Sequence, residues 1–160
     1  MPSKILVTGG LGYIGSHTSV ELIEQGFEVL IVDDLSNSSL EVLVGIKNIT
    51  GVTPEFIQLD LRDKNKVNQL FSDHPTLSGV IHFAAFKAVG ESVKKPLDYY
   101  ENNLGGLIHL LQAIEKKPQP FSFIFSSSCT VYGQADRLPI TEEAPIKKAE
   151  SPYGNTKQIG

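Results

Sequence analysis

The chain has 160 residues, of which 41% are hydrophobic and 20% are charged. This composition supports one packed domain rather than two, and it excludes a disordered tail. The net charge of −4 argues against nucleic acid as a partner, because a phosphate backbone is bound by a basic face. The sequence contains no apolar run of the length that spans a bilayer, so no membrane partner is expected either.

The compartment is suggested by the cysteine usage and the start of the chain. A single cysteine, Cys129, cannot form an internal disulfide, which suits a reducing environment. The chain starts Met1-Pro2-Ser3-Lys4 and then enters a strand-like run, without the apolar stretch and cleavage site of a signal peptide. We therefore expect a cytoplasmic protein.

Short β-branched runs alternate with longer helical patterns along the chain. In chain order, the patterns predict a strand at 4–8, a helix at about 12–25, strands at 28–32 and 55–59 with a helix at 38–50 between them, a helix at 63–72, a strand at 79–83, a helix at 97–117 and a strand at 121–125. A polar, proline-containing stretch over 137–152 predicts a long loop, and a last helix begins at Tyr153. The alternation is typical of βαβ units. It predicts an α/β Rossmann fold, with a doubly wound, mostly parallel sheet and helices on both faces.

A glycine-rich turn joins the first strand to the first helix. Gly10, Gly12 and Gly15 fit the G-x-G-x-x-G spacing, and Gly9 begins the wider G-x-x-G-x-x-G pattern. Such glycines allow a tight turn, a close approach of the backbone to a pyrophosphate, and close packing of helix on strand. The helix N-terminus offers unpaired N–H groups to phosphates, so the turn is a candidate dinucleotide site rather than an ordinary solvated turn.

The ends of the next strands support a dinucleotide site. Asp33 ends the second strand, where its carboxylate can accept hydrogen bonds from the adenosine ribose hydroxyls and would repel a 2′-phosphate. This favours NAD over NADP. Asp60 and Leu61 follow the third strand and could contact the adenine. Ala84 and Ala85 end the fourth strand, and their small size either admits a cofactor or serves tight packing.

Three residues near the end of the chain form a candidate catalytic group. Tyr153 and Lys157 are four residues apart on a helix and so share a face, and Ser128 follows the fifth strand. A tyrosine is a poor base at neutral pH unless a neighbouring positive charge lowers its pKa. The arrangement suits removal of a hydroxyl proton during hydride transfer. The alternative, a surface helix with two unrelated side chains, is countered by the motif order along the chain.

Three stretches together resemble a known family. They cover residues 7–17 (VTGGLGYIGSH), 82–92 (HFAAFKAVGES) and 125–133 (FSSSCTVYG). The chain is similar to the extended short-chain dehydrogenase/reductases and, within that family, to the group of UDP-glucose 4-epimerases. At three positions this chain departs from the commonest pattern of the family: it has Asp34, Ala85 and Cys129 where asparagine, glycine and alanine are frequent.

The resemblance implies a set of site residues. Implied NAD-binding residues are Gly9, Gly12, Tyr13, Ile14, Gly15, Asp33, Asp34, Leu35, Ser36, Asn37, Ser38, Asp60, Leu61, Phe83, Ala84, Ala85, Phe86, Lys87, Asn102, Tyr153 and Lys157. Implied catalytic residues are Tyr153, Lys157 and Ser128, with Ser128 and Tyr153 also touching the substrate. No metal is expected, because none of the four histidines has a partner at metal-ligand spacing.

The resemblance also implies an activity and an assembly. The implied reaction interconverts UDP-galactose and UDP-glucose, with transient oxidation at sugar C4 by NAD. Residues 1–160 would be the NAD-binding domain, truncated before the family's substrate domain, and the full-length protein would be a homodimer. Alternatives are a 4,6-dehydratase, a UDP-N-acetylglucosamine 4-epimerase, or a module that only binds NAD. Against the dehydratase, Cys129-Thr130 stand where those relatives carry an Asp-Glu pair.

Overall fold

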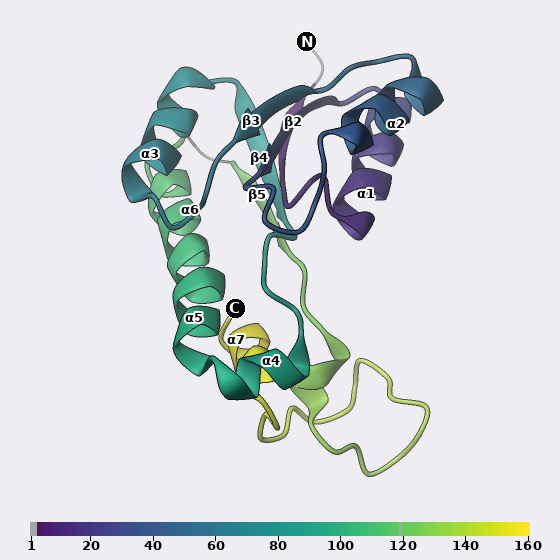
Figure 1. Ribbon diagram of the computed structural model, residues 1–160, viewed down its shortest axis with the longest axis vertical. Coiled ribbons are helices and arrows are strands. Elements are labelled where there is room, and N and C mark those ends of the chain that lie inside the picture. Colours follow the sequence, from purple (N-terminus) through teal and green to yellow (C-terminus); the bar gives the residue numbers. More distant parts are fainter. Residues whose placement is uncertain (1–2, 119) are drawn as a thin grey trace.

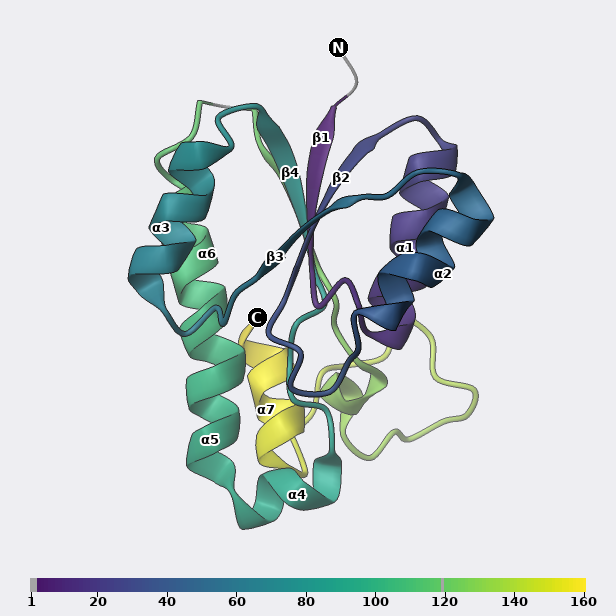
Figure 2. The same ribbon diagram turned by 45° about the horizontal axis from the view of Figure 1, so that its top comes forward.

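A computed structural model describes residues 3–118 and 120–160, so Met1 and Pro2 of the expected domain and Gln119 lie outside the description. The centre of the fold is a twisted sheet between two layers of helices (Figures 1 and 2). Its strands are β1 (Lys4–Thr8), β2 (Glu28–Asp33), β3 (Glu55–Gln58), β4 (Leu77–His82) and β5 (Ser122–Phe125). They lie in the order β3-β2-β1-β4-β5, and every pairing is parallel. The predicted fold class is confirmed.

Each central strand contributes side chains to two hydrophobic cores, because successive side chains alternate between the faces of the sheet. Leu6 and Leu30 lie in one core, and Val7 and Ile31 lie in the other. The helices α3 (Lys64–Asp73) and α6 (Gly106–Ile114) cover the first face, whereas α1 (Tyr13–Glu24) and α2 (Glu41–Thr50) cover the second (Figure 2). The central strands β1 and β2 are therefore buried on both sides, whereas the edge strands β3 and β5 are partly exposed.

The predicted helix at 97–117 has a more complex form. It consists of α5 (Pro96–Tyr100), a π-helical turn (Glu101–Gly105) and α6, which ends at Ile114. Before it comes α4 (Val89–Lys94), a six-residue helix that the sequence pattern does not predict. A helix this short has too few residues for an apolar periodicity to be recognised.

The last helix, α7 (Pro152–Ile159), lies beside α4 and α5, below the sheet in Figure 1. The Ser151 side chain caps it by accepting a hydrogen bond from the Gly154 N–H at 3.1 Å, and Pro152 occupies its first turn. Between a 3-10 turn (Cys129–Tyr132) and α7 the chain forms the predicted long loop. No helix in the described part of the chain is long and apolar enough to cross a membrane.

Candidate functional site

A cleft of about 540 Å³ opens at the carboxyl ends of the strands. In a doubly wound sheet this edge is where ligands bind, next to the point where the strand order reverses. Here that point lies between β1 and β4. The cleft is lined by Gly9, Gly12, Tyr13, Ile14, Gly15, Val32, Asp33, Asp34, Ser36, Asn37, Ser38, Leu59, Asp60, Leu61, Phe83, Ala84, Ala85, Phe86, Lys87, Asn102, Ser126, Ser127, Ser128, Tyr153 and Lys157.

The glycine-rich turn forms one wall of the cleft. Gly9 has a φ of +65°, and a Cβ built on it would stand 2.7 Å from the Ala84 nitrogen, so the turn and the end of β4 meet backbone to backbone. Gly12 is the N-cap of α1 and has no side chain to satisfy the first N–H groups of the helix, whose first turn carries no acidic residue. These N–H groups and the helix dipole are therefore available to an anion.

The Asp33 carboxylate organises one end of the cleft. Although Asp33 is buried, its carboxylate accepts hydrogen bonds from the Leu11 N–H (3.1 Å), the Leu35 N–H (3.0 Å) and the Ser38 hydroxyl (2.7 Å). A carboxylate has about four acceptor positions, so at least one is left for a ligand hydroxyl.

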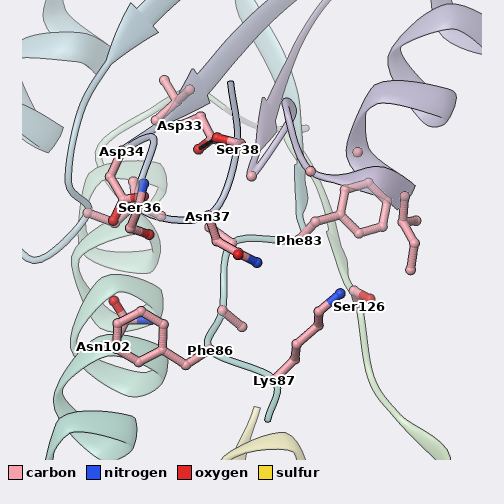
Figure 3. A pocket seen from close by; sticks show the side chains of 18 of the residues that line it. Asp33, Asp34, Ser36, Asn37, Ser38, Phe83, Phe86, Lys87, Asn102 and Ser126 are labelled. Atoms are coloured by element: carbon pink, nitrogen blue, oxygen red, sulfur yellow. Dashed lines mark hydrogen bonds between the residues drawn. The ribbon is translucent and has the colours of Figure 1, made fainter. Parts of the chain in front are cut away.

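Leu35 differs from the prediction. Its side chain does not line the cleft but packs in the core under α1 and α2. The backbone has a φ of +64°, a left-handed conformation that a leucine adopts only under tertiary constraint. This conformation turns the side chain inward, while its neighbours Ser36, Asn37 and Ser38 line the cleft (Figure 3).

Asp60, in the lining of the cleft, forms an ion pair with Arg62. Its carboxylate accepts from the Arg62 guanidinium at 3.0, 3.0 and 2.6 Å and from the Arg62 N–H at 2.9 Å. The hydrogen bonds from Arg62 hold the pKa of Asp60 below its ordinary value, so this group is an anionic acceptor at neutral pH. The predicted role as an acceptor for an adenine amine is compatible with this geometry.

The segment that follows β4 crosses the floor of the cleft. Figure 3 shows Phe86 directed toward Asn102, and Lys87 extended the other way, toward Ser126. Lys87 thus brings a positive charge into the cleft opposite the glycine-rich turn.

The three candidate catalytic residues line one end of the same cleft. The Ser128 hydroxyl oxygen accepts from the Thr130 hydroxyl at 3.0 Å and from the Thr130 N–H at 3.3 Å. Because these donors occupy its oxygen, Ser128 can direct its own proton to a ligand. Tyr153 and Lys157 come from α7.

Lys157 is fixed by two contacts. Its Nζ donates to the Ser126 carbonyl at 2.7 Å and lies 4.8 Å from the centre of the Phe125 ring. Burial lowers the pKa of Lys157 to about 8. His82 is buried nearby, and burial together with the Lys157 charge lowers its pKa to about 3, so His82 is neutral. Its Nδ1 pairs with the Thr8 hydroxyl at 2.7 Å.

The structure therefore brings together every predicted site residue except Leu35. The cleft lining also includes four residues that are not among the predicted site residues: Val32, Leu59, Ser126 and Ser127. Val32, Leu59 and Ser127 each directly precede a selected residue, and Ser126 begins the same run of serines, so adjacency at a strand end is the signal that could have found them. Within residues 3–118 and 120–160 no group of histidine, cysteine and acidic side chains is arranged to hold a metal ion.

The strand order, the glycine-rich turn and the cleft define a Rossmann-type nucleotide-binding fold. The model of the GDP-mannose 4,6 dehydratase family matches residues 6–160, and the chain belongs to this family. The family match agrees with the short-chain dehydrogenase/reductase motifs.

Several UDP-glucose 4-epimerases are similar to this chain in sequence. The chain is 50% identical to that of Yersinia pestis and 52% identical to that of Bacillus subtilis, in each case over 96% of this chain but 45% and 44% of the relative. A solved UDP-glucose 4-epimerase from Bifidobacterium longum, in complex with NAD⁺ and UDP, aligns with a TM-score of 0.92 and 44% identity over 98% of this chain and 46% of that one. The chain thus spans less than half the length of these relatives.

Proposed function

We propose that residues 1–160 form the NAD-binding domain of a UDP-glucose 4-epimerase. The observation that carries this proposal is that Tyr153, Lys157 and Ser128 line the same cleft as the glycine-rich turn and Asp33. A dinucleotide lying along the cleft would run from the Asp33 carboxylate, past the α1 N-terminus, to the Tyr153 end. The named relatives and the bound NAD⁺ and UDP of the Bifidobacterium longum enzyme support the cofactor and the substrate class.

The residues of the cleft fit this cofactor. Gly9 lets the turn meet the end of β4 backbone to backbone, the α1 N-terminus offers N–H donors to a pyrophosphate, and Asp33 offers an acceptor to a ribose. No arginine lies beside Asp33 in the sequence to receive a 2′-phosphate, which favours NAD over NADP.

The chain's own residues would remove and return the proton of the sugar C4 hydroxyl. When bound, NAD supplies a hydride acceptor and donor at that carbon. Tyr153, as a phenolate, takes the proton from the 4-hydroxyl, and Ser128 shares the hydrogen bond to that oxygen. Lys157 stabilises the phenolate with its positive charge and is held in place by the Ser126 carbonyl. The same groups return the proton after the sugar has presented its other face.

The residues beside Ser128 favour epimerisation over dehydration within this family. Elimination of water requires an acid and a base next to the reacting sugar. The two residues after Ser128 are Cys129, whose thiol is exposed, and Thr130, whose hydroxyl is committed to Ser128. Neither offers the carboxyl groups that such a reaction uses.

We further propose that the full-length protein is a homodimer and works in the cytoplasm. Exposed apolar side chains follow one stripe along α5 and α6: Leu97 is 79% exposed, Ile108 50% and Leu111 44%. Their helical spacing would let a second copy pack against the same stripe. A reducing cytoplasm suits the free, exposed Cys129. Sedimentation of the protein with and without Leu97→Glu tests the dimer, which the charge should weaken.

The decisive experiment measures conversion of UDP-galactose to UDP-glucose with NAD added, alongside NAD binding. Tyr153→Phe should abolish turnover and leave NAD affinity within about threefold of the wild type, because the ring stays and only the acid–base hydroxyl is lost. NAD binding without turnover would assign the chain to cofactor binding alone. A wild-type protein that folds but does not bind NAD would refute the proposal.

A further inference from the structure

The backbone of the segment from Phe83 to Ala88 is held mainly by side chains. This segment leaves β4, crosses the floor of the cleft and reaches α4 without belonging to a helix or a strand. Buried backbone groups need hydrogen-bond partners, and an irregular segment has no ladder that supplies them. At Phe86 and Ala88 two buried side chains from the α5 region, Asn103 and Tyr99, supply most of them, and the Ala88 carbonyl also accepts from the Ser92 N–H at 3.0 Å.

Asn103 pairs with Phe86 in the manner of a neighbouring strand. Its Oδ1 accepts from the Phe86 N–H at 2.8 Å, and its Nδ2 donates to the Phe86 carbonyl at 3.0 Å. The second Nδ2 proton goes to the Thr156 hydroxyl at 3.1 Å, and Oδ1 also accepts from the Asn102 side chain at 3.0 Å. Both donors and both acceptor positions of the amide are therefore used.

Tyr99 pairs with Ala88 in the same way. Its hydroxyl accepts from the Ala88 N–H at 3.0 Å and lies 2.9 Å from the Ala88 carbonyl, sharing its proton between this oxygen and Glu91 Oε2 at 3.0 Å. The Tyr99 ring also packs against Phe86, with 5.5 Å between ring centres. Only 1% of the Tyr99 residue surface is exposed, so its ring is fixed in the core while its hydroxyl reaches the more exposed Ala88 and Glu91.

The packing of Phe86 indicates where Lys87 points. The Phe86 ring packs against Tyr99 on the α5 side, and successive side chains of an extended segment point to opposite sides, so Lys87 projects away from α5. Figure 3 shows Lys87 extending away from Phe86, toward Ser126 across the cleft.

The hydrogen bonds of Asn103 also reach α7, the helix that carries Tyr153 and Lys157. The Thr156 hydroxyl, which accepts from Asn103, donates to the Tyr153 carbonyl at 2.7 Å. A line of hydrogen bonds thus joins the Phe86 backbone to the backbone of the candidate catalytic tyrosine.

We propose that Tyr99 and Asn103 form a polar clamp on Phe86 and Ala88 that positions Lys87 toward the phosphates or ribose of the bound dinucleotide. The clamp rests on the proposed function in so far as its ligand is NAD. Tyr99 and Asn103 do not line the cleft, so they are positioning residues and act through Lys87.

A double-mutant cycle tests the proposal by titration calorimetry with NAD⁺. Lys87→Met should weaken binding about tenfold and Tyr99→Phe about fivefold, amounts that correspond to a charge-assisted and an ordinary hydrogen bond. In the Lys87→Met background, Tyr99→Phe should cost less than about twofold, because the side chain that it positions is gone. Equal losses in both backgrounds would show that the Tyr99 hydroxyl supports the fold generally and would overturn the proposal.

Hydrogen exchange provides a readout that does not depend on NAD. Exchange of the Ala88 amide should accelerate in Tyr99→Phe, and exchange of the Phe86 amide should accelerate in Asn103→Ala, while amides of β1 keep their protection. Tyr100→Phe is the matched control, since it removes a neighbouring hydroxyl that binds Asn155 instead. Unchanged exchange at residues 86 and 88 overturns the clamp. If the wild type does not bind NAD⁺, the proposed function is wrong and the exchange rates alone decide the clamp.

Discussion

The Asp33 carboxylate at the end of β2 accepts a hydrogen bond from the Leu11 N–H, 3.1 Å away in the glycine-rich turn. The same carboxylate holds the Leu35 N–H and the Ser38 hydroxyl. One buried side chain therefore ties together the two loops that form this end of the cleft. Asp33 organises the site as well as offering it an acceptor.

Asp33→Asn should lower both stability and NAD affinity. All three protein partners of Asp33 are donors, so an amide NH₂ placed among them loses an acceptor and adds an unmatched donor. We expect the free energy of unfolding to fall by about 1.5–3 kcal/mol, the range for hydrogen bonds to a charged group. Urea denaturation and calorimetric titration with NAD⁺ measure the two effects.

The neighbouring carboxylate provides the control for that change. Asp34 is half-buried, and its Oδ1 accepts from the Ser36 N–H at 2.9 Å, an interaction that an asparagine can also make. Asp34→Asn should change the free energy of unfolding by less than about 0.5 kcal/mol. Similar losses for the two variants would contradict the organising role of Asp33.

His82 should make the protein sensitive to acid. Its pKa in the folded protein is about 3, against an ordinary value of 6.5, so between these values the unfolded chain binds more protons than the folded one. Stability therefore decreases as the pH falls below 6.5. His82→Asn, which can still pair with Thr8, should remove this slope, and the wild type should lose up to about 3 kcal/mol more than the variant between pH 6.5 and pH 4.

Urea denaturation at several pH values measures the slope. His17→Asn is the control, because it removes a histidine from the exposed surface of α1. Parallel stability profiles for the wild type and His82→Asn would show that His82 does not remain neutral in the fold.

Lys4, at the start of β1, forms ion pairs with the first residues of β2 and β3, at the edge of the sheet opposite the cleft. Its Nζ lies 2.8 Å from both Glu28 Oε1 and Glu55 Oε2. Burial alone would lower the pKa of Lys4, but the hydrogen bonds and charges of the two glutamates outweigh it and raise the pKa. The stabilisation is therefore present at neutral pH and is lost only as the pH rises above the ordinary value of 10.5.

Lys4→Met should lower the free energy of unfolding at pH 7 by about 1 kcal/mol, because the half-exposed glutamates regain water when the ammonium is removed. NAD affinity should not change. Lys66→Met is the control: its pair with Asp63 is 3.6 Å long and the lysine side chain is 70% exposed. Equal effects of the two substitutions on urea denaturation would rule out a special contribution of Lys4.

Much of this site could be predicted because its residues follow strand ends. Gly9, Asp33, Asp60 and Ala84 are each marked by their place at the end of a strand-like run, and the parallel sheet then brings these ends to one edge. That logic depends on local pattern and strand direction alone, so it succeeds before any contact is known.

The missed features depend on tertiary contacts. The bond between Asp33 and Leu11 joins residues 22 apart, and no local pattern marks Leu11 as a donor. Tyr99 and Asn103 look like ordinary helix residues, since their partners lie 11 and 17 residues away in an irregular segment. The left-handed backbone of Leu35 likewise contradicts the local preference of leucine, and only the surrounding core accounts for it.

Lys157 should influence stability in the alkaline range. Burial lowers its pKa to about 8 from the ordinary 10.5, so between these values the unfolded chain binds more protons than the folded one. The free-energy cost of burying the charged ammonium is therefore largest below pH 8, and it disappears as the pH approaches 10.5. The stability of the wild type should rise, relative to Lys157→Met, by about 1 kcal/mol between pH 7.5 and pH 10, a value discounted for partial access of solvent.

Urea denaturation of both proteins across this pH range tests the expectation. Lys148→Met, in the exposed loop before α7, is the matched control and should follow the wild type. NAD affinity supplies a second readout, because the neutral amine has lost the charge proposed to support Tyr153 and the cofactor. Wild-type affinity should decline above pH 8, whereas the affinity of Lys157→Met should be weaker throughout and independent of pH in this range. A wild-type decline that persists in Lys157→Met would assign the titration to another group.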